Sequence, residues 1–146
     1  METEGLLAPE SPADAREQYA DLATAAATVV KESVRRMEFD RVERDERLTN
    51  DVYATAHDAL FASLLTVQVG TREEFETWCD DHPDYDRHVE GSDTVENVVW
   101  HAVPFAETVV AATYQNEREA AVGTLRRIAF GRLYRSELER AGATGE

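Results

Sequence analysis

The chain has 146 residues, a formal net charge of −15 and an apolar content of 42%. This length suits one domain that buries a core without disulfides or metal ions, and the apolar content excludes a disordered chain. The negative charge disfavours a protein whose main partner is a phosphate backbone.

The basic residues have an unusual composition, because Lys31 is the only lysine among 15 lysine and arginine residues. An acidic surface, arginine in place of lysine and abundant alanine together favour a protein adapted to multimolar salt. In about 1 M salt the Debye length is about 3 Å, so clustered carboxylates repel one another only weakly. We therefore expect a halophilic, archaeal, cytoplasmic protein.

The sequence shows no sign of export or of membrane insertion. Cys79 is the only cysteine, so no disulfide can form within the chain. The first ten residues lack the basic segment and apolar run of a signal peptide. The longest uncharged apolar stretch, residues 59–71, falls short of the roughly 20 residues that a spanning helix needs.

The first half of the chain predicts helices. Residues 1–10 are expected to be a flexible tail, as are residues 141–146. Ser11 can cap a helix over residues 12–37, which has one apolar stripe at steps of three and four residues. A charged connector follows over residues 38–48, and a second helix is expected over residues 50–64, with Thr49 as its cap.

The middle of the chain leaves one ambiguity. Residues 65–69 predict either a strand or a continuation of the preceding helix. Thr71 and Glu74 form a capping-box pattern before a short helix over residues 72–81. A surface loop with a short edge strand near residues 87–90 is expected next.

The last third supplies most of the core. Two apolar strands are predicted over residues 97–103 and 108–114, followed by a helix over residues 117–140 that Asn116 caps. The fold class is therefore α+β, a single domain with a small antiparallel sheet centred on this C-terminal hairpin and three main helices packed on it.

The last helix carries two apolar ridges, which implies two neighbours. The broader ridge contains Val122, Leu125, Ile128, Ala129 and Leu133, and the second contains Phe130, Tyr134 and Leu138. In one interpretation the sheet covers one ridge and the first helix covers the other. In the other, the Phe130 ridge is a candidate interface between subunits.

No Walker loop, dinucleotide-binding glycine pattern, zinc-protease motif, nucleophile elbow, paired-cysteine motif or EF-hand occurs. The sequence therefore predicts no catalytic residue, cofactor or metal. Cys79, His82 and His88 do not have a zinc-binding spacing, and the acidic residues around Cys79 disfavour its thiolate. The arginines of the last helix are spread around it, which favours pairing with carboxylates over binding nucleic acid.

One candidate binding site can be named, and its residues are His57, Trp100, His101 and Glu107. His57 lies on the apolar arc of the second helix, and period two puts His101 on the strand face opposite Trp100. If that helix packs on that face, the two imidazoles and Glu107 could form a metal or general-base site. The alternative is that each histidine is a core residue with one hydrogen-bond partner.

Four segments carry a resemblance, and they read TAHDALFASL, VGTREEFETWCDDHP, VVWHAVPFAETVVAATYQNE and TLRRIAFGRLYR. With them the chain resembles a small family of uncharacterised proteins, a domain of unknown function, from halophilic archaea. The resemblance implies a salt-adapted origin and no particular activity.

Two hypotheses follow for function. The first is a non-catalytic protein that acts through self-association, as a homo-oligomer, or through a protein partner. The alternative is a small-ligand or metal-dependent enzyme or binding site around His57, His101 and Glu107.

Overall fold

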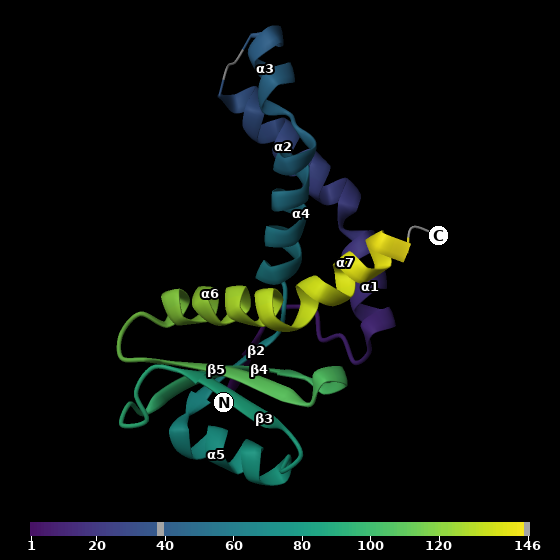
Figure 1. The fold of residues 1–146 in the computed structure, drawn as a ribbon. Helices are drawn as coiled ribbons and strands as arrows, with labels where there is room; N and C mark the ends of the chain where they lie inside the picture. The colour runs from purple at the N-terminus through teal and green to yellow at the C-terminus, as the bar shows by residue number, and fades with distance from the viewer. Residues whose placement is uncertain (38–39, 145–146) are drawn as a thin grey trace.

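A computed structural model of the chain describes residues 1–37 and 40–144, and its side-chain description leaves out residues 45 and 140–144. Five strands form one mixed sheet with the order β1-β2-β4-β5-β3 (Figure 1). The strands are β1 (Glu2–Glu4), β2 (Val67–Thr71), β3 (Asp86–Glu90), β4 (Asn97–Val103) and β5 (Thr108–Tyr114).

The hairpin of β4 and β5 is the centre of the sheet, as predicted, and both strands have the predicted bounds. Glu107, with a φ of 45°, closes the turn after a short 3-10 helix over Pro104–Ala106. The sheet is not wholly antiparallel, because the predicted edge strand near 87–90 pairs with β5 in parallel. The ambiguous residues 65–69 lead into strand β2, so the preceding helix does not continue through them.

Seven α-helices are described, and a π-helical turn, η2 (Phe130–Tyr134), joins the last two. The helices are α1 (Pro12–Asp21), α2 (Ala23–Arg36), α3 (Arg41–Arg47), α4 (Asn50–Ser63), α5 (Arg72–Asp81), α6 (Arg118–Ala129) and α7 (Arg135–Thr144). Among the described residues, no helix is long and apolar enough to cross a lipid bilayer.

Helices cover both faces of the sheet because its strands alternate side chains between two cores. On one face, Trp100 and its neighbours on β4 and β5 pack against Phe75 and Cys79 of α5. On the other face, Val99, Val103 and Val110 pack beneath α6, together with Phe61 and Tyr134. Figure 1 shows α5 on one side of the sheet and α6 with α7 on the other.

The segment before α1, where a flexible tail is expected over residues 1–10, contacts the rest of the chain. Strand β1 pairs with β2, and the amides of Leu6 and Leu7 both donate to the carbonyl of Leu64, at 2.8 Å. Gly5 has a φ of 100°, and a Cβ there would lie 2.5 Å from the carbonyl oxygen of Leu65. This close approach requires a glycine.

The predicted helix over residues 12–37 is two helices, which corrects the prediction. Ser11 caps α1 as expected, but the chain turns at Leu22. Beyond this turn α2 leaves the body of the protein and packs against α4. Figure 1 shows α2, α3 and the outer part of α4 projecting from the body, and we call residues 23–52 the arm. Residues 38 and 39 of the predicted connector lie outside the described residues.

The predicted helix over residues 117–140 is also divided, because η2 interrupts it. Asn116 does not cap it: Glu117 is the N-cap residue of α6 and makes no capping hydrogen bond with its side chain. The π-helical turn turns Phe130 and Tyr134 inward, with 4% and 0% of their surfaces exposed, while Gly131 between them is exposed. Such a turn shifts the phase of a helix, so both rings enter the core.

Candidate functional site

His101 lies deep in the core with both of its ring nitrogens engaged. Nδ1 is 2.6 Å from the carbonyl oxygen of Thr66, and Nε2 is 2.7 Å from the hydroxyl of Tyr134. Because a carbonyl only accepts, Nδ1 carries the proton and Nε2 accepts from Tyr134. Burial lowers the pKa of His101 to about 4, although the hydrogen bond to the carbonyl of Thr66 raises this pKa by a smaller amount. The ring is therefore neutral near pH 7 and has no lone pair left for a metal ion.

His57 lies at the junction of α1 and α4. Its ring stacks on that of Tyr19 with a centroid separation of 3.6 Å, and Nε2 donates to the carbonyl oxygen of Tyr19 at 2.6 Å. The hydroxyl of Tyr19 donates to Asp58 at 2.7 Å. Burial, followed by this carboxylate, raises the pKa of Tyr19 far above its usual value. The histidine therefore fastens α1 to α4.

The two histidines are not brought together. A row of three aromatic rings separates them, with Tyr19 against His57, Phe61 in the middle and Tyr134 against His101. The ring centroids of Phe61 lie 5.6 Å from Tyr19 and 5.5 Å from Tyr134, in edge-to-face contacts. Each histidine thus ends a packed row of rings, and no ion or water molecule can be shared between them across Phe61.

The other two candidate residues, Glu107 and Trp100, lie in different surroundings. Glu107 is exposed at the hairpin turn, where its carbonyl accepts from the amide of Asp86 at 2.8 Å. Trp100 is fully buried on the opposite face of the sheet from His101, and its indole N–H has no hydrogen-bond partner among the described residues. A pocket of about 220 Å³ is lined by both Trp100 and His101, together with Thr66, Gln68 and Trp78.

The predicted interface residues lie inside the chain. Phe130 and Tyr134 contact Phe61 edge to face, with centroid separations of 5.9 Å and 5.5 Å, and Leu138 is half-buried against the same core. Helix α1 packs on α7 beside them. The Phe130 ridge therefore has neighbours within one chain.

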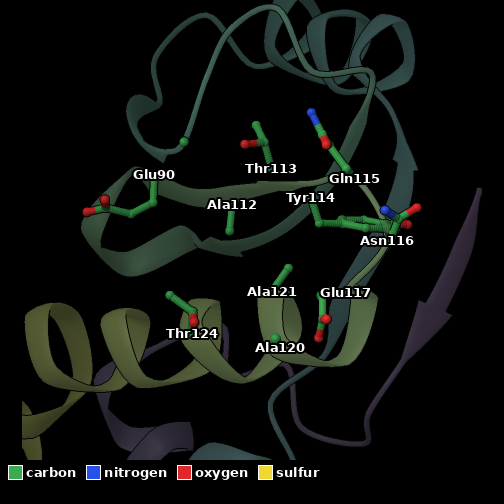
Figure 2. Close-up of a pocket in the computed structure, with 11 residues that line it drawn as sticks. Glu90, Ala112, Thr113, Tyr114, Gln115, Asn116, Glu117, Ala120, Ala121 and Thr124 are labelled. Carbon is green, nitrogen blue, oxygen red and sulfur yellow. The ribbon is translucent and has the colours of Figure 1, made fainter.

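The largest described pocket, of about 490 Å³, lies elsewhere. Figure 2 shows it between the ends of β3 and β5 and the first half of α6. Ala112 and Ala121 face each other across it, and Glu90, Glu117 and Thr124 lie around them. Glu90 accepts from His88 at 3.0 Å. The pocket contains none of the predicted site residues and no nucleophile hydrogen-bonded to a base among the bonds described, so it does not define a reaction.

The part of the chain that the structure describes holds no group of three or more histidine, cysteine, aspartate or glutamate side chains that could bind a metal ion. Burial raises the pKa of the Cys79 thiol, which disfavours its reactive thiolate form.

The surface feature that sequence reasoning missed is the arm. Four large apolar side chains there are exposed: Val29 at 54%, Met37 at 62%, Val42 at 67% and Val52 at 39%. The arm was missed because the turn at Leu22 was not predicted. A helix that continued along the sheet would have buried these valines. The long uncharged stretches of α2 and α4 gave the only hint in the sequence.

Comparisons with known proteins identify a family and nothing about activity. No curated protein and no solved structure matches this chain. One family model does match, and it spans residues 6–135, from the docked N-terminal segment to the first residue of α7. The chain belongs to that family, described as a family of unknown function (DUF5809).

Proposed function

We propose that this protein is non-catalytic and acts by association, with the arm as its contact element. The carrying observation is that the arm projects from the body and exposes Val29, Met37, Val42 and Val52 (Figure 1). Burying such a side chain against a partner contributes roughly 1.5–3 kcal/mol, which is the gain that a docking surface offers. Exposed apolar residues gathered on one projecting element are typical of interaction sites.

The charge distribution supports the same element. Residues 23–52 contain six lysine and arginine residues against seven aspartate and glutamate residues, while the whole chain has a net charge of −15. The arm is therefore almost neutral, and nearly all of the net negative charge lies on the rest of the chain. Repulsion between this protein and an acidic partner is weakest at the arm.

Photocrosslinking in cells tests the proposal. A p-benzoylphenylalanine at Val29, Met37 or Val52 should give adducts heavier than the monomer. The same residue at Arg127, which is exposed on α6, is the control on the body of the protein and should give none. Equal yields at Arg127 and at the arm, or no adducts at the arm, would contradict the proposal.

We also propose that the protein works in the cytoplasm of a halophilic, salt-accumulating archaeon. The support is compositional: 30 acidic residues against 15 basic ones, with a single lysine. Clustered carboxylates of this density repel one another in dilute buffer and are screened in brine. The melting temperature should rise strongly from about 0.1 M to about 3 M KCl. A melting temperature that does not change over this range would argue against salt adaptation.

A further inference from the structure

We infer that the pocket beside Trp100 binds a small uncharged molecule, and that a carbonyl oxygen of this molecule accepts from the indole N–H of Trp100. The pocket has a volume of about 220 Å³ and lies where the end of β4 meets the start of β2 and the segment before α1. Two residues of the predicted binding site, Trp100 and His101, line it. None of its lining residues belongs to the arm, so this inference is tested independently of the proposed function.

The indole N–H of Trp100 is the carrying observation. Trp100 has 0% of its surface exposed, and its Nε1 has no hydrogen-bond partner among the described residues. A buried donor without an acceptor costs free energy, and in folded proteins such groups nearly always have a partner, which is often a bound molecule. An acceptor from outside the chain is therefore expected beside this nitrogen.

The orientation of the ring turns this N–H toward the pocket. A Cβ at Gly70 would lie 3.2 Å from Cη2 and 3.3 Å from Cζ3 of Trp100, so the six-membered ring extends over Gly70. Nε1 belongs to the five-membered ring, and its N–H points away from Gly70. Trp100 pairs with Gln68 across the two strands. The pocket is lined by Gln68 and Thr66, so it lies on the side of the ring away from Gly70.

The other polar groups of the pocket also favour a ligand that accepts. The hydroxyl of Thr3 donates to Oε1 of Gln68 at 2.9 Å, and the NH2 group of Gln68 has no partner among the described residues. The carbonyl oxygen of Thr66 already accepts from Nδ1 of His101 at 2.6 Å. These acceptors are engaged while two donors are free, so the ligand must supply an oxygen that accepts.

The charge of the pocket selects an uncharged ligand. Among the described residues that line it, Glu10 is the only one with a charge, and Glu10 is exposed. The lining therefore offers no lysine or arginine to an anion, which the carboxylate of Glu10 and the net charge of −15 repel. A cation offers no acceptor to the N–H of Trp100. An amide fits best, because its carbonyl oxygen accepts and its N–H can donate to Glu10.

The size of the pocket limits the ligand to a small molecule. A water molecule takes about 30 Å³ of liquid water, so a pocket of about 220 Å³ has room for about seven non-hydrogen atoms. This is less than the roughly 300 Å³ at which pockets for drug-sized ligands begin. So few atoms support only weak binding, and we expect a Kd in the millimolar range.

An NMR titration of the nitrogen-15-labelled full chain with acetamide, in KCl brine, tests this inference. The chain has two tryptophans, and the Trp78→Phe variant identifies the indole N–H signal of Trp100 because only that signal remains. The Trp100 signal should shift and reach saturation as acetamide is added. Acetate is the matched probe, since it has the size and shape of acetamide and a negative charge, and it should leave the signal in place.

Two variants locate the binding. Ala102→Leu fills the pocket without changing Trp100, because Ala102 lines it, and should weaken the binding of acetamide at least about tenfold. Ala120→Leu makes the same change in the pocket between β5 and α6, and should bind acetamide like the wild type. A wild-type Trp100 signal that does not respond to acetamide, or that responds equally to acetate, would overturn the inference, and so would an unchanged response in a folded Ala102→Leu variant.

Discussion

The body and the arm differ in the size of the side chains that pack between their helices. In the body, large rings fill the space between α1, α4, α6 and the sheet, with Phe61 and Tyr134 fully buried. In the arm, α2 and α4 meet through small side chains such as Ala26, Val30 and Val34, and valines on their outer sides remain exposed. The difference indicates that burial in the body supplies most of the free energy of folding. The exposed valines of the arm are not buried when one chain folds.

The difference in stability should be largest for a ring at the centre of the body. Phe61→Ala removes the ring that contacts Tyr19, Phe130 and Tyr134, and should lower the free energy of unfolding by roughly 3–5 kcal/mol. Val30→Ala, which removes two methyl groups between α2 and α4, should cost roughly 1–2 kcal/mol. Urea unfolding at one fixed KCl concentration measures both. Equal losses would show that the arm contributes as much stability as the body.

The second largest effect is a dependence of stability on pH, and it involves His101, a residue of the body. His101 has a pKa of about 4 in the fold, below the usual 6.5, so between these values the unfolded chain binds a proton that the folded chain does not. The free energy of unfolding should fall by about 3 kcal/mol as the pH drops through this window, and the contribution is fully present above it.

His101→Gln should remove that dependence on pH, whatever its effect on stability at neutral pH. The measurement is the urea midpoint at pH steps from about 7 to about 4. If His101→Gln loses stability with falling pH as steeply as the wild type, then His101 is not the group responsible.

A smaller effect should follow from the hydroxyl of Tyr134. Tyr134→Phe leaves Nε2 of His101 buried without its donor, which should cost about 1–3 kcal/mol. Tyr53→Phe, on the half-buried side of α4 next to the arm, should change stability by less than about 0.5 kcal/mol. Thermal unfolding of the two variants compares them directly. A larger loss for Tyr53→Phe would reverse the contrast between body and arm.

The smallest effects concern two threonine caps. Thr71 caps α5 in a complete capping box, and Thr49 caps α4 at the tip of the arm. Thr71→Ala should lower the global free energy of unfolding by about 1 kcal/mol. Thr49→Ala should mainly increase local hydrogen exchange in the first turns of α4, because the arm can open without the body. Similar losses of global stability for both would indicate one cooperative unit.

The sequence predicted correctly the elements that are determined by residues nearby in the chain. The strands over 97–103 and 108–114 and the helix over 72–81 have the predicted bounds, since alternation and the capping box specify them. The caps Ser11 and Thr49 were also predicted correctly. In each case the residues that determine the element lie within it or next to it.

The elements that were predicted wrongly depend on contacts between residues that are far apart in the sequence. Nothing local at Leu22 ends a helix, and the turn there reflects α1 packing on α7 while α2 packs on α4. The strand β1 needs the edge of β2, more than 60 residues later. His57 contacts Tyr19 and His101 contacts Tyr134, and only the fold places Phe61 between these two tyrosines.

The two edges of the sheet have a consequence for how this chain meets its own copies. β1 has three residues and β3 has five, and both carry acidic side chains: Glu2 and Glu4 on the first, Asp86 and Glu90 on the second. Short, charged edge strands resist the addition of a strand from another molecule, which is the usual route to aggregation. Both edges of the sheet are therefore poor templates for a strand of a second molecule.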